Sequence, residues 1–201
     1  MKTMRQGFSL IEILVVVAIA SAIVLVASNL NSNVSVLNSL VSQQLQSKSD
    51  ITQTLQIVTT DIRSASASAN GGYPIESAAT SSFVFYSDPD GDGLAERIRY
   101  FLASSSIYRG ITQPTGTPAV YVTSTETVTN MFDNIILSST TPLFSYYDAS
   151  YAGSQPAMTS TVDVSPIRMV GIAFSADVQP MQSPGPQFFS TLIAIRNLRN
   201  N

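Results

Sequence analysis

The chain of 201 residues contains neither cysteine nor histidine. Without cysteine it can form no disulfide. Without histidine it lacks the commonest general base, nucleophile activator and transition-metal ligand. Serine is abundant, but a hydrolase built around a serine would have nothing to activate the hydroxyl group. Phosphate-binding loops of the Walker type are also absent. We therefore expect a protein that is not an enzyme.

Charged residues are scarce, at 11% of the chain, and the formal net charge is −3. The globular part contains only scattered arginines and no long basic cluster. Neutralising the phosphates of a nucleic acid requires clustered positive charge. The composition therefore argues against direct nucleic-acid binding.

Glycine and proline are missing from the whole stretch between residues 8 and 70. In its second half, apolar residues recur at spacings of mostly three and four, which is typical of an amphipathic helix. We expect one helix that ends at Asn70, where two glycines follow as a C-cap signal. Asparagines and serines over residues 28–35 favour the helix poorly, so two helices with a hinge there are the alternative. The apolar positions are Val34, Leu37, Val41, Leu45, Ile51, Leu55, Val58 and Ile62.

The first half of this stretch is apolar and contains one ionisable side chain, Glu12. A helix over residues 8–28 rises about 1.5 Å per residue, which is enough to span the roughly 30 Å hydrocarbon core of a bilayer. A carboxylate in such a segment is costly, so we expect Glu12 to serve a function. Two basic residues, Lys2 and Arg5, precede the segment and predict a cytoplasmic N-terminus.

The N-terminus resembles the class III signal sequence of type IV pilins and pseudopilins. The resemblance lies in the short basic leader, Gly7, Phe8, Glu12 and the apolar run that follows. It implies cleavage by prepilin peptidase between Gly7 and Phe8, and N-methylation of the new Phe8 amine. It also implies that Glu12 contacts the Phe8 amine of a neighbouring subunit and so sets the register of assembly. Pairing of Glu12 with the amine of its own chain is the alternative.

Two other readings of the N-terminus are an ordinary secretory signal peptide and an uncleaved signal anchor. A secretory signal would place its cleavage site after the apolar region, where residues 18–20 or 20–22 could serve. It would explain neither a glycine before the apolar region nor a glutamate inside it. The pilin-like signal accounts for both.

The chain after the predicted helix is typical of antiparallel strands. We expect an α+β fold, with a long N-terminal helix, first transmembrane and then amphipathic, packed on an antiparallel β-sheet head. The predicted domains are a leader (1–7), a transmembrane or filament-core helix (8–28), an amphipathic helix (29–70) and the head (71–201). The predicted strands are 82–87, 97–103, 119–124, 134–138, 143–147, 168–176 and 188–196.

An acidic, glycine-rich segment connects the first two predicted strands, which favours a hairpin with an enlarged loop. Asp88, Asp90, Asp92 and Glu96 stand at positions 1, 3, 5 and 9 of a pattern that matches the first part of an EF-hand loop. These four residues are candidate calcium ligands. Position 12 is Arg99 and not glutamate, so either another acid such as Asp148 or Asp163 completes the site or the site binds calcium weakly. A polar hairpin turn without metal is the alternative.

Further segments resemble the PilW-type minor pilins and the J-type pseudopilins. They are residues 61–65, 96–100, 107–109, 144–148 and 195–199, in that order. The resemblance implies a subunit that primes or caps a type IV pilus used for adhesion, twitching motility or DNA uptake. The alternatives are a pseudopilin of a type II secretion system and a membrane-tethered binding module that reuses the leader.

The same resemblance implies partners and a location. The partners are other major and minor pilins, prepilin peptidase and the inner-membrane assembly platform. Before assembly the subunit would cross the bacterial inner membrane with its leader in the cytoplasm. After assembly it would lie in a pilus or pseudopilus.

Overall fold

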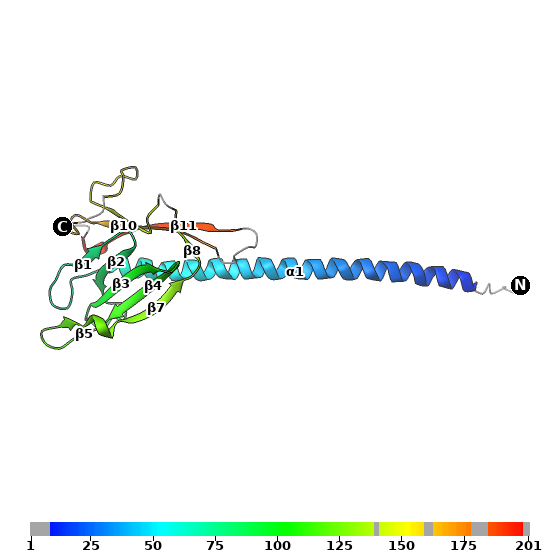
Figure 1. Cartoon of the computed structure of the whole chain (residues 1–201), viewed down its shortest axis with the longest axis horizontal. Coiled ribbons are helices and arrows are strands. Elements are labelled where there is room, and N and C mark those ends of the chain that lie inside the picture. Colours follow the sequence, from blue (N-terminus) through cyan, green and yellow to red (C-terminus); the bar gives the residue numbers. More distant parts are fainter. Residues whose placement is uncertain (1–8, 139–140, 159–162, 178–184, 199–201) are drawn as a thin grey trace, which may run out of the picture. The chain divides into compact units, whose positions relative to one another are not determined.

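The chain folds into one long helix and an antiparallel β head, which confirms the predicted α+β class (Figure 1). It divides into two compact units, residues 1–48 and 49–201. The computed structural model describes residues 9–138, 141–158, 163–177 and 185–198. Within the helix it describes the backbone alone at 26–37, 39, 40, 43–47 and 50.

The helix α1 runs without interruption from Leu10 to Arg63, over 54 residues. This confirms a single helix and contradicts the alternative of a hinge over residues 28–35. The lack of glycine and proline explains the continuity, because each would cost more in a helix interior than the asparagines and serines that are present. The side chains of residues 28–35 lie outside the described part of the chain.

The helix ends at Arg63, so the predicted end at Asn70 is wrong. Beyond Arg63 the backbone bonds with the head instead, because the Ser66 N–H donates to the carbonyl of Tyr86 at 2.9 Å. The Ser64 hydroxyl lies 2.8 Å from both the Thr60 carbonyl and the Ser87 hydroxyl. Serine side chains compete in this way with the helical hydrogen-bond ladder. Asn70 belongs to a separate tight turn, in which Gly71 adopts a φ of +83°.

The first sheet has five strands in the order β1-β2-β3-β4-β7, all pairs antiparallel (Figure 1). The hairpin of β2 and β3 confirms the one predicted around the acidic loop. The other three strands were not predicted. The bounds are β1 Ile75–Ala78, β2 Ser82–Ser87, β3 Glu96–Ala103, β4 Ser106–Thr112 and β7 Thr127–Phe132.

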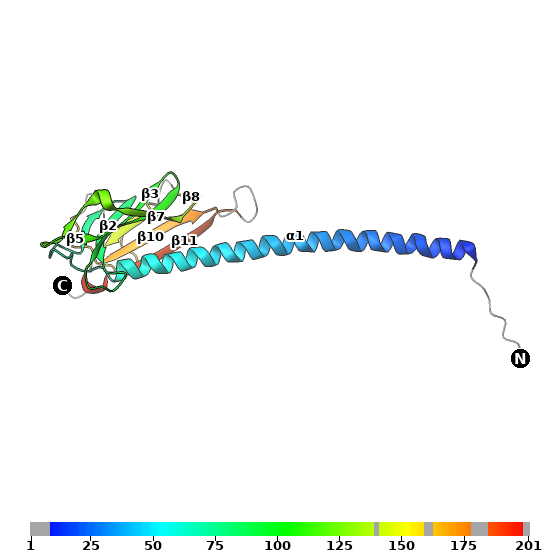
Figure 2. The ribbon, with the colours of Figure 1, turned by 90° about the horizontal axis from the view of Figure 1, so that it is seen from below.

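The second sheet is centred on β10, with β11 along one edge (Figure 2). Strands β8 and β9 pair with different parts of the other edge of β10. All four strands fall within predicted ones or overlap them. A two-stranded ribbon, β5 with β6, and two short 3-10 helices complete the described head. The bounds are β5 Pro114–Thr115, β6 Val120–Tyr121, η1 Thr123–Thr125, β8 Ile135–Ile136, β9 Phe144–Tyr147, β10 Met169–Ala176, β11 Gln187–Ala194 and η2 Arg196–Leu198.

The core of the head joins the end of α1 to both sheets. Ile51, Val58 and Ile62 of the predicted apolar stripe are buried, and Leu55 packs against the same cluster. Val41 of the same stripe is 54% exposed. The amphipathic pattern therefore predicts the buried face of α1 correctly within the head. Core residues from the sheets include Phe83, Phe85, Ile98, Tyr100, Phe144, Val170, Phe174 and Ile193.

An ion pair across the first sheet predicts a pH-dependent stability. Glu76 accepts two hydrogen bonds of 2.7 Å from Arg97 and one of 2.7 Å from Tyr86. Burial alone would raise the pKa of Glu76, but the bonds from Arg97 and Tyr86 outweigh it and hold the pKa below 4.5. The ion pair therefore stabilises the fold at pH values above 4.5, and this stabilisation is lost as the pH falls through the lowered pKa of Glu76.

We expect Glu76→Gln to lower the free energy of unfolding by about 0.5–1 kcal/mol at neutral pH, since the Glu76 side chain is 36% exposed. Chemical denaturation of both proteins at about pH 7 and about pH 3 measures the difference. It should nearly vanish at the acidic pH. An equal difference at both pH values would contradict this role of the ion pair.

Candidate functional site

Glu12 lies in the first turn of α1. Its N–H donates to the carbonyl of Ser9 at 3.0 Å, which begins the helix just after the predicted cleavage position. A carboxylate in the first turn is favourable for the helix dipole. Gly7 and Phe8, the predicted cleavage and methylation residues, lie outside the described residues.

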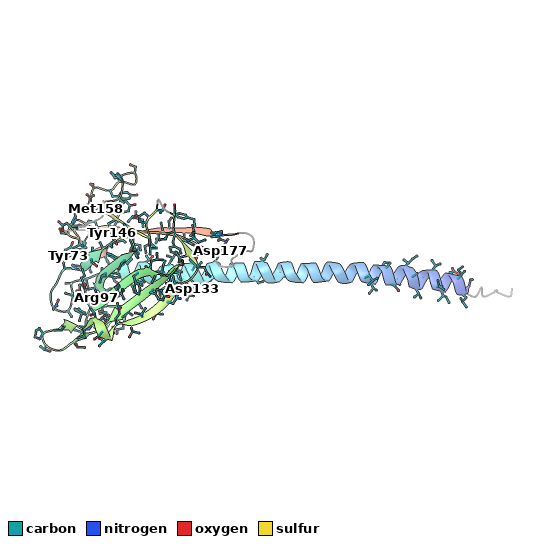
Figure 3. All side chains as sticks on the ribbon, viewed as in Figure 1. Tyr73, Arg97, Asp133, Tyr146, Met158 and Asp177 are labelled. Carbon is teal, nitrogen blue, oxygen red and sulfur yellow. The ribbon has the colours of Figure 1, made fainter. Side chains whose placement is uncertain are left out.

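The apolar side chains of α1 between residues 10 and 25 are exposed around the whole helix. The large ones range from 49% exposed at Val15 to 82% at Leu10. They project from both sides of the helix in Figure 3. A helix that is apolar all round is covered by other protein or by lipid in its working state. Over the described residues, however, none of the helices combines the length and hydropathy that a membrane crossing requires.

The acidic loop between β2 and β3 is organised around Asp88. Its carboxylate accepts hydrogen bonds from the backbone N–H groups of Gly91 at 2.7 Å, Asp92 at 3.1 Å and Gly93 at 2.9 Å. These bonds, that of Gly93 first, lower the pKa of Asp88. The loop therefore holds one ionised carboxylate in a fixed position.

Glu96 is the first residue of β3 and is fully buried. It lies opposite Ser87, the last residue of β2. Neither oxygen of its carboxylate has a hydrogen-bond partner among the described residues. Burial, and next the negative charge of Asp90, raise the pKa of Glu96 to about 7. A buried carboxylate that lacks a partner is costly and requires an explanation.

The structure brings together three of the four predicted calcium ligands. Carboxylate oxygens of Asp88, Asp90 and Glu96 all lie within 4.8 Å of one another. Asp92 is not part of this group, and its carboxylate accepts the N–H of Leu94 at 2.7 Å. Three of the four acids in the EF-hand pattern thus lie close together, and calcium binding by them stays a prediction.

The residues expected to complete an EF-hand-like site lie elsewhere. Arg99 forms an ion pair with Glu126. Asp148 accepts hydrogen bonds from the backbone and side chain of Ser150, and Asp163 accepts those of Ser165. The expectation that Asp148 or Asp163 completes the site is therefore wrong. Each of the two acids is used by a local turn of its own.

A buried polar network that was not predicted fixes the end of α1 to the first sheet. Asp61, 4% exposed, accepts hydrogen bonds from Tyr100 of β3 at 2.7 Å and from Arg109 of β4 at 2.8 Å. Burial raises the pKa of Asp61, and the bonds from Tyr100 and Arg109 offset this in part. All three residues lie in segments that carry the minor-pilin resemblance. The resemblance indicated the residues but not their contact.

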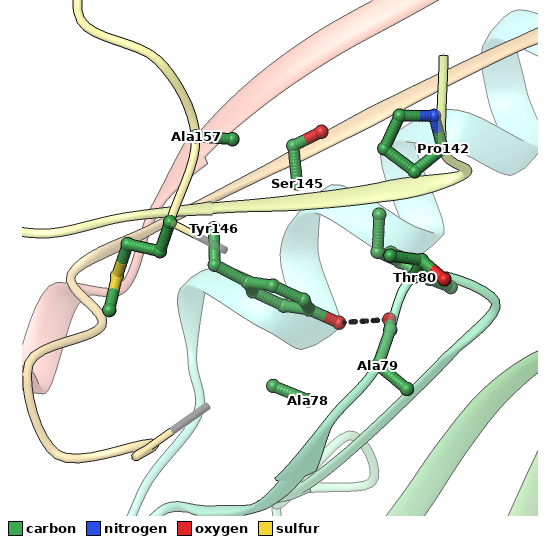
Figure 4. A pocket seen from close by; sticks show the side chains of 9 residues that line it. Ala78, Ala79, Thr80, Pro142, Ser145, Tyr146 and Ala157 are labelled. Atoms are coloured by element: carbon green, nitrogen blue, oxygen red, sulfur yellow. Dashed lines mark hydrogen bonds between the residues drawn. The ribbon is translucent and has the colours of Figure 1, made fainter. Parts of the chain in front are cut away.

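A small cavity lies between the turn after β1 and strand β9 (Figure 4). Its volume of about 40 Å³ is far below the several hundred Å³ of a typical ligand pocket. The Tyr146 hydroxyl closes one side by donating to the Ala79 carbonyl at 2.7 Å. This cavity has room for little more than a water molecule.

Comparison with protein families finds the prokaryotic N-terminal methylation motif over residues 2–28. The chain therefore carries a type IV pilin-like class III signal, as its N-terminal residues predict. A comparison with curated proteins finds no match. A signal of this kind is typical of pilins and pseudopilins. It supports processing by a peptidase and assembly with other pilins, and it suggests a membrane anchor. It covers none of the head.

Proposed function

We propose that this protein is a minor pilin, a structural subunit that primes or caps a type IV pilus. The observation that carries the proposal is the methylation motif over residues 2–28, which runs directly into α1. The α+β head at the other end of this helix fits the same class of subunit. The role is one of assembly and not of catalysis.

In this proposal prepilin peptidase cleaves the chain between Gly7 and Phe8. The exposed apolar part of α1 lies in the inner membrane before assembly and against other pilin helices afterwards. Lipid contacts are exchanged for helix contacts of similar polarity, so the hydrophobic free energy changes little on extraction. The energy for extraction has to come from a motor protein of the assembly platform.

Glu12 would set the position of the subunit as its helix leaves the lipid and packs against other pilin helices. Cleavage creates an α-amino group at Phe8, and the carboxylate of Glu12 in an adjacent subunit would pair with it. The attraction between opposite charges grows as the dielectric constant around them falls. Subunits that stack head to tail in this way form an open helical fibre.

Deletion of the gene in its own host tests the assignment. We expect loss of surface pili in electron micrographs, while secretion of exoproteins stays at the wild-type level. Full-length protein expressed in trans should restore the pili. Loss of secretion with pili intact would overturn the proposal in favour of a pseudopilin. No change in either would favour a tethered binding module.

A further inference from the structure

We propose that Asp88, Asp90 and Glu96 form a calcium site that closes the loop between β2 and β3. The proposal concerns the head alone and is independent of the assembly role. Three carboxylates from separate positions converge, with oxygens of all three within 4.8 Å of one another. Two come from the exposed loop and the third from the first residue of a core strand.

The burial of the Glu96 carboxylate without a hydrogen-bond partner is the observation that points to a ligand. Its side chain is fully buried, and neither oxygen has a hydrogen-bond partner among the described residues. Native proteins rarely leave such a group unpaired, because a lone buried carboxylate loses its hydration without compensation. Its oxygens face the carboxylates of Asp88 and Asp90, which makes the cost greater by repulsion. A cation between the three groups removes both penalties.

The nearby arginines do not supply that positive charge. Arg97 follows Glu96 in the chain, but it binds Glu76 through two hydrogen bonds of 2.7 Å. Arg99 pairs with Glu126, and Arg109 pairs with Asp61. With these arginines engaged elsewhere, the described residues place three carboxylates together without a matching cation from the protein. The missing charge is that of a divalent ion.

The ligand set favours calcium among the divalent ions. Every donor is a carboxylate oxygen, and the chain has no histidine or cysteine to select zinc or copper. Calcium accepts six to eight oxygen ligands in flexible geometry, so backbone carbonyls and water can complete the shell. Magnesium requires near-ideal octahedral geometry. A hairpin loop that contributes two ligands only two positions apart, Asp88 and Asp90, suits the larger ion better.

The loop already holds one ligand in place. Asp88 accepts three backbone N–H groups, from Gly91, Asp92 and Gly93, which fixes the carboxylate before any ion binds. The end of β2 that leads into the loop also contacts the end of α1, since the Ser87 hydroxyl lies 2.8 Å from that of Ser64. Calcium at Glu96 would therefore stabilise the junction between the helix and the sheet. It would do so in a chain that has no disulfide.

Calorimetric titration of the full-length protein in detergent, stripped of metal with a chelator, tests the site. We expect one calcium ion to bind with a Kd in the range of about 0.1–1 mM, as in extracellular calcium modules. About 10 mM calcium should raise the Tm by several degrees, because the ion binds only the folded state. The same concentration of magnesium should raise it much less. Equal effects of the two ions, or no binding of calcium, would overturn the proposal.

Two matched variants separate this site from an EF-hand-like loop. Asp90→Asn and Asp92→Asn each remove one charge from the same exposed loop, but only Asp90 belongs to the group of three. We expect Asp90→Asn to raise the calcium Kd at least about tenfold, because the variant replaces a charged oxygen ligand by a neutral one. Asp92→Asn should raise it less than about threefold, since it changes only the more distant charge. Equal losses in the two variants would contradict the proposed ligand set.

Glu96→Gln tests the buried ligand itself. The variant keeps the shape of the side chain and removes its charge, so it should lose calcium binding while the metal-free head stays folded. Retention of wild-type affinity in Glu96→Gln would overturn the proposal. If this variant does not fold, the comparison of Asp90→Asn with Asp92→Asn decides the matter by itself.

Discussion

Replacing Arg109 with methionine is expected to lower the free energy of unfolding by about 3–5 kcal/mol at neutral pH. Arg109 donates from Nε to Asp61 at 2.8 Å, its Nη2 lies 2.7 Å from the same carboxylate oxygen, and Asp61 is almost fully buried. The variant fills the space of the arginine stem but leaves the Asp61 carboxylate with Tyr100 as its remaining partner in the network. An uncompensated buried charge is the costly element, and the lost attraction matters less. Denaturant unfolding of the full-length chain, followed by near-ultraviolet circular dichroism, measures the effect.

The pH dependence of this loss has a definite sign. Burial already raises the pKa of Asp61 above 3.8, and removal of Arg109 should raise it further. The penalty is therefore largest where Asp61 must be ionised and shrinks as the pH falls toward the ordinary value. The double variant Asp61→Asn with Arg109→Met should recover part of the stability at neutral pH. A loss below about 1 kcal/mol in the single variant would contradict a buried ion pair, since that is the range of exposed pairs.

Substituting Glu12 with glutamine is expected to remove the subunit from fibres while leaving its membrane level and its processing unchanged. Glu12 is the single ionisable residue of the apolar stretch, and the proposed register depends on its charge. Loss of a desolvated charge pair costs several kcal/mol, and about 1.4 kcal/mol already corresponds to a factor of ten. We expect the amount of this subunit in sheared fibres, measured by immunoblot, to fall at least about tenfold.

Ser21→Ala is the matched control for this experiment. Ser21 is another polar residue on the apolar part of α1, but its hydroxyl donates to the Val17 carbonyl of the same helix at 2.7 Å. Its hydrogen bond is thus satisfied without a neighbouring subunit, and fibre content should stay near the wild-type level. Normal incorporation of Glu12→Gln would contradict the register role. Equal losses in both variants would indicate a general effect of changes in this helix.

The sequence predicts those parts of the fold that local patterns determine. Strands β2 and β3 were predicted because aromatic and β-branched residues flank an acidic turn. Strand β7 was missed because most of its side chains are exposed at a sheet edge, so apolar alternation is absent. The end of α1 was misplaced because the Ser66 backbone bonds with the carbonyl of Tyr86, across the head. A hydrogen bond to a residue so far along the chain leaves no local pattern in the sequence.

The sequence likewise predicts those candidate sites whose residues are close together in the chain. The leader motif is contiguous in the chain, so the sequence alone identifies it. The acidic loop was predicted from its spacing, but the burial of Glu96 follows from its place at the start of β3. The pairing of Asp61 with Arg109 joins residues 48 positions apart. Their contact depends on how the sheet and helix pack, and no spacing rule contains it.

Mass spectrometry of the N-terminal peptide of the protein, purified from its own host, tests whether the chain is processed as a pilin. We expect a peptide that begins at Phe8 and carries one methyl group on its α-amino nitrogen. The Gly7 side of the cut should be missing from the mature protein. A mature chain that still begins before Gly7, or one cleaved after the apolar segment, would contradict the assignment to the pilin-like class.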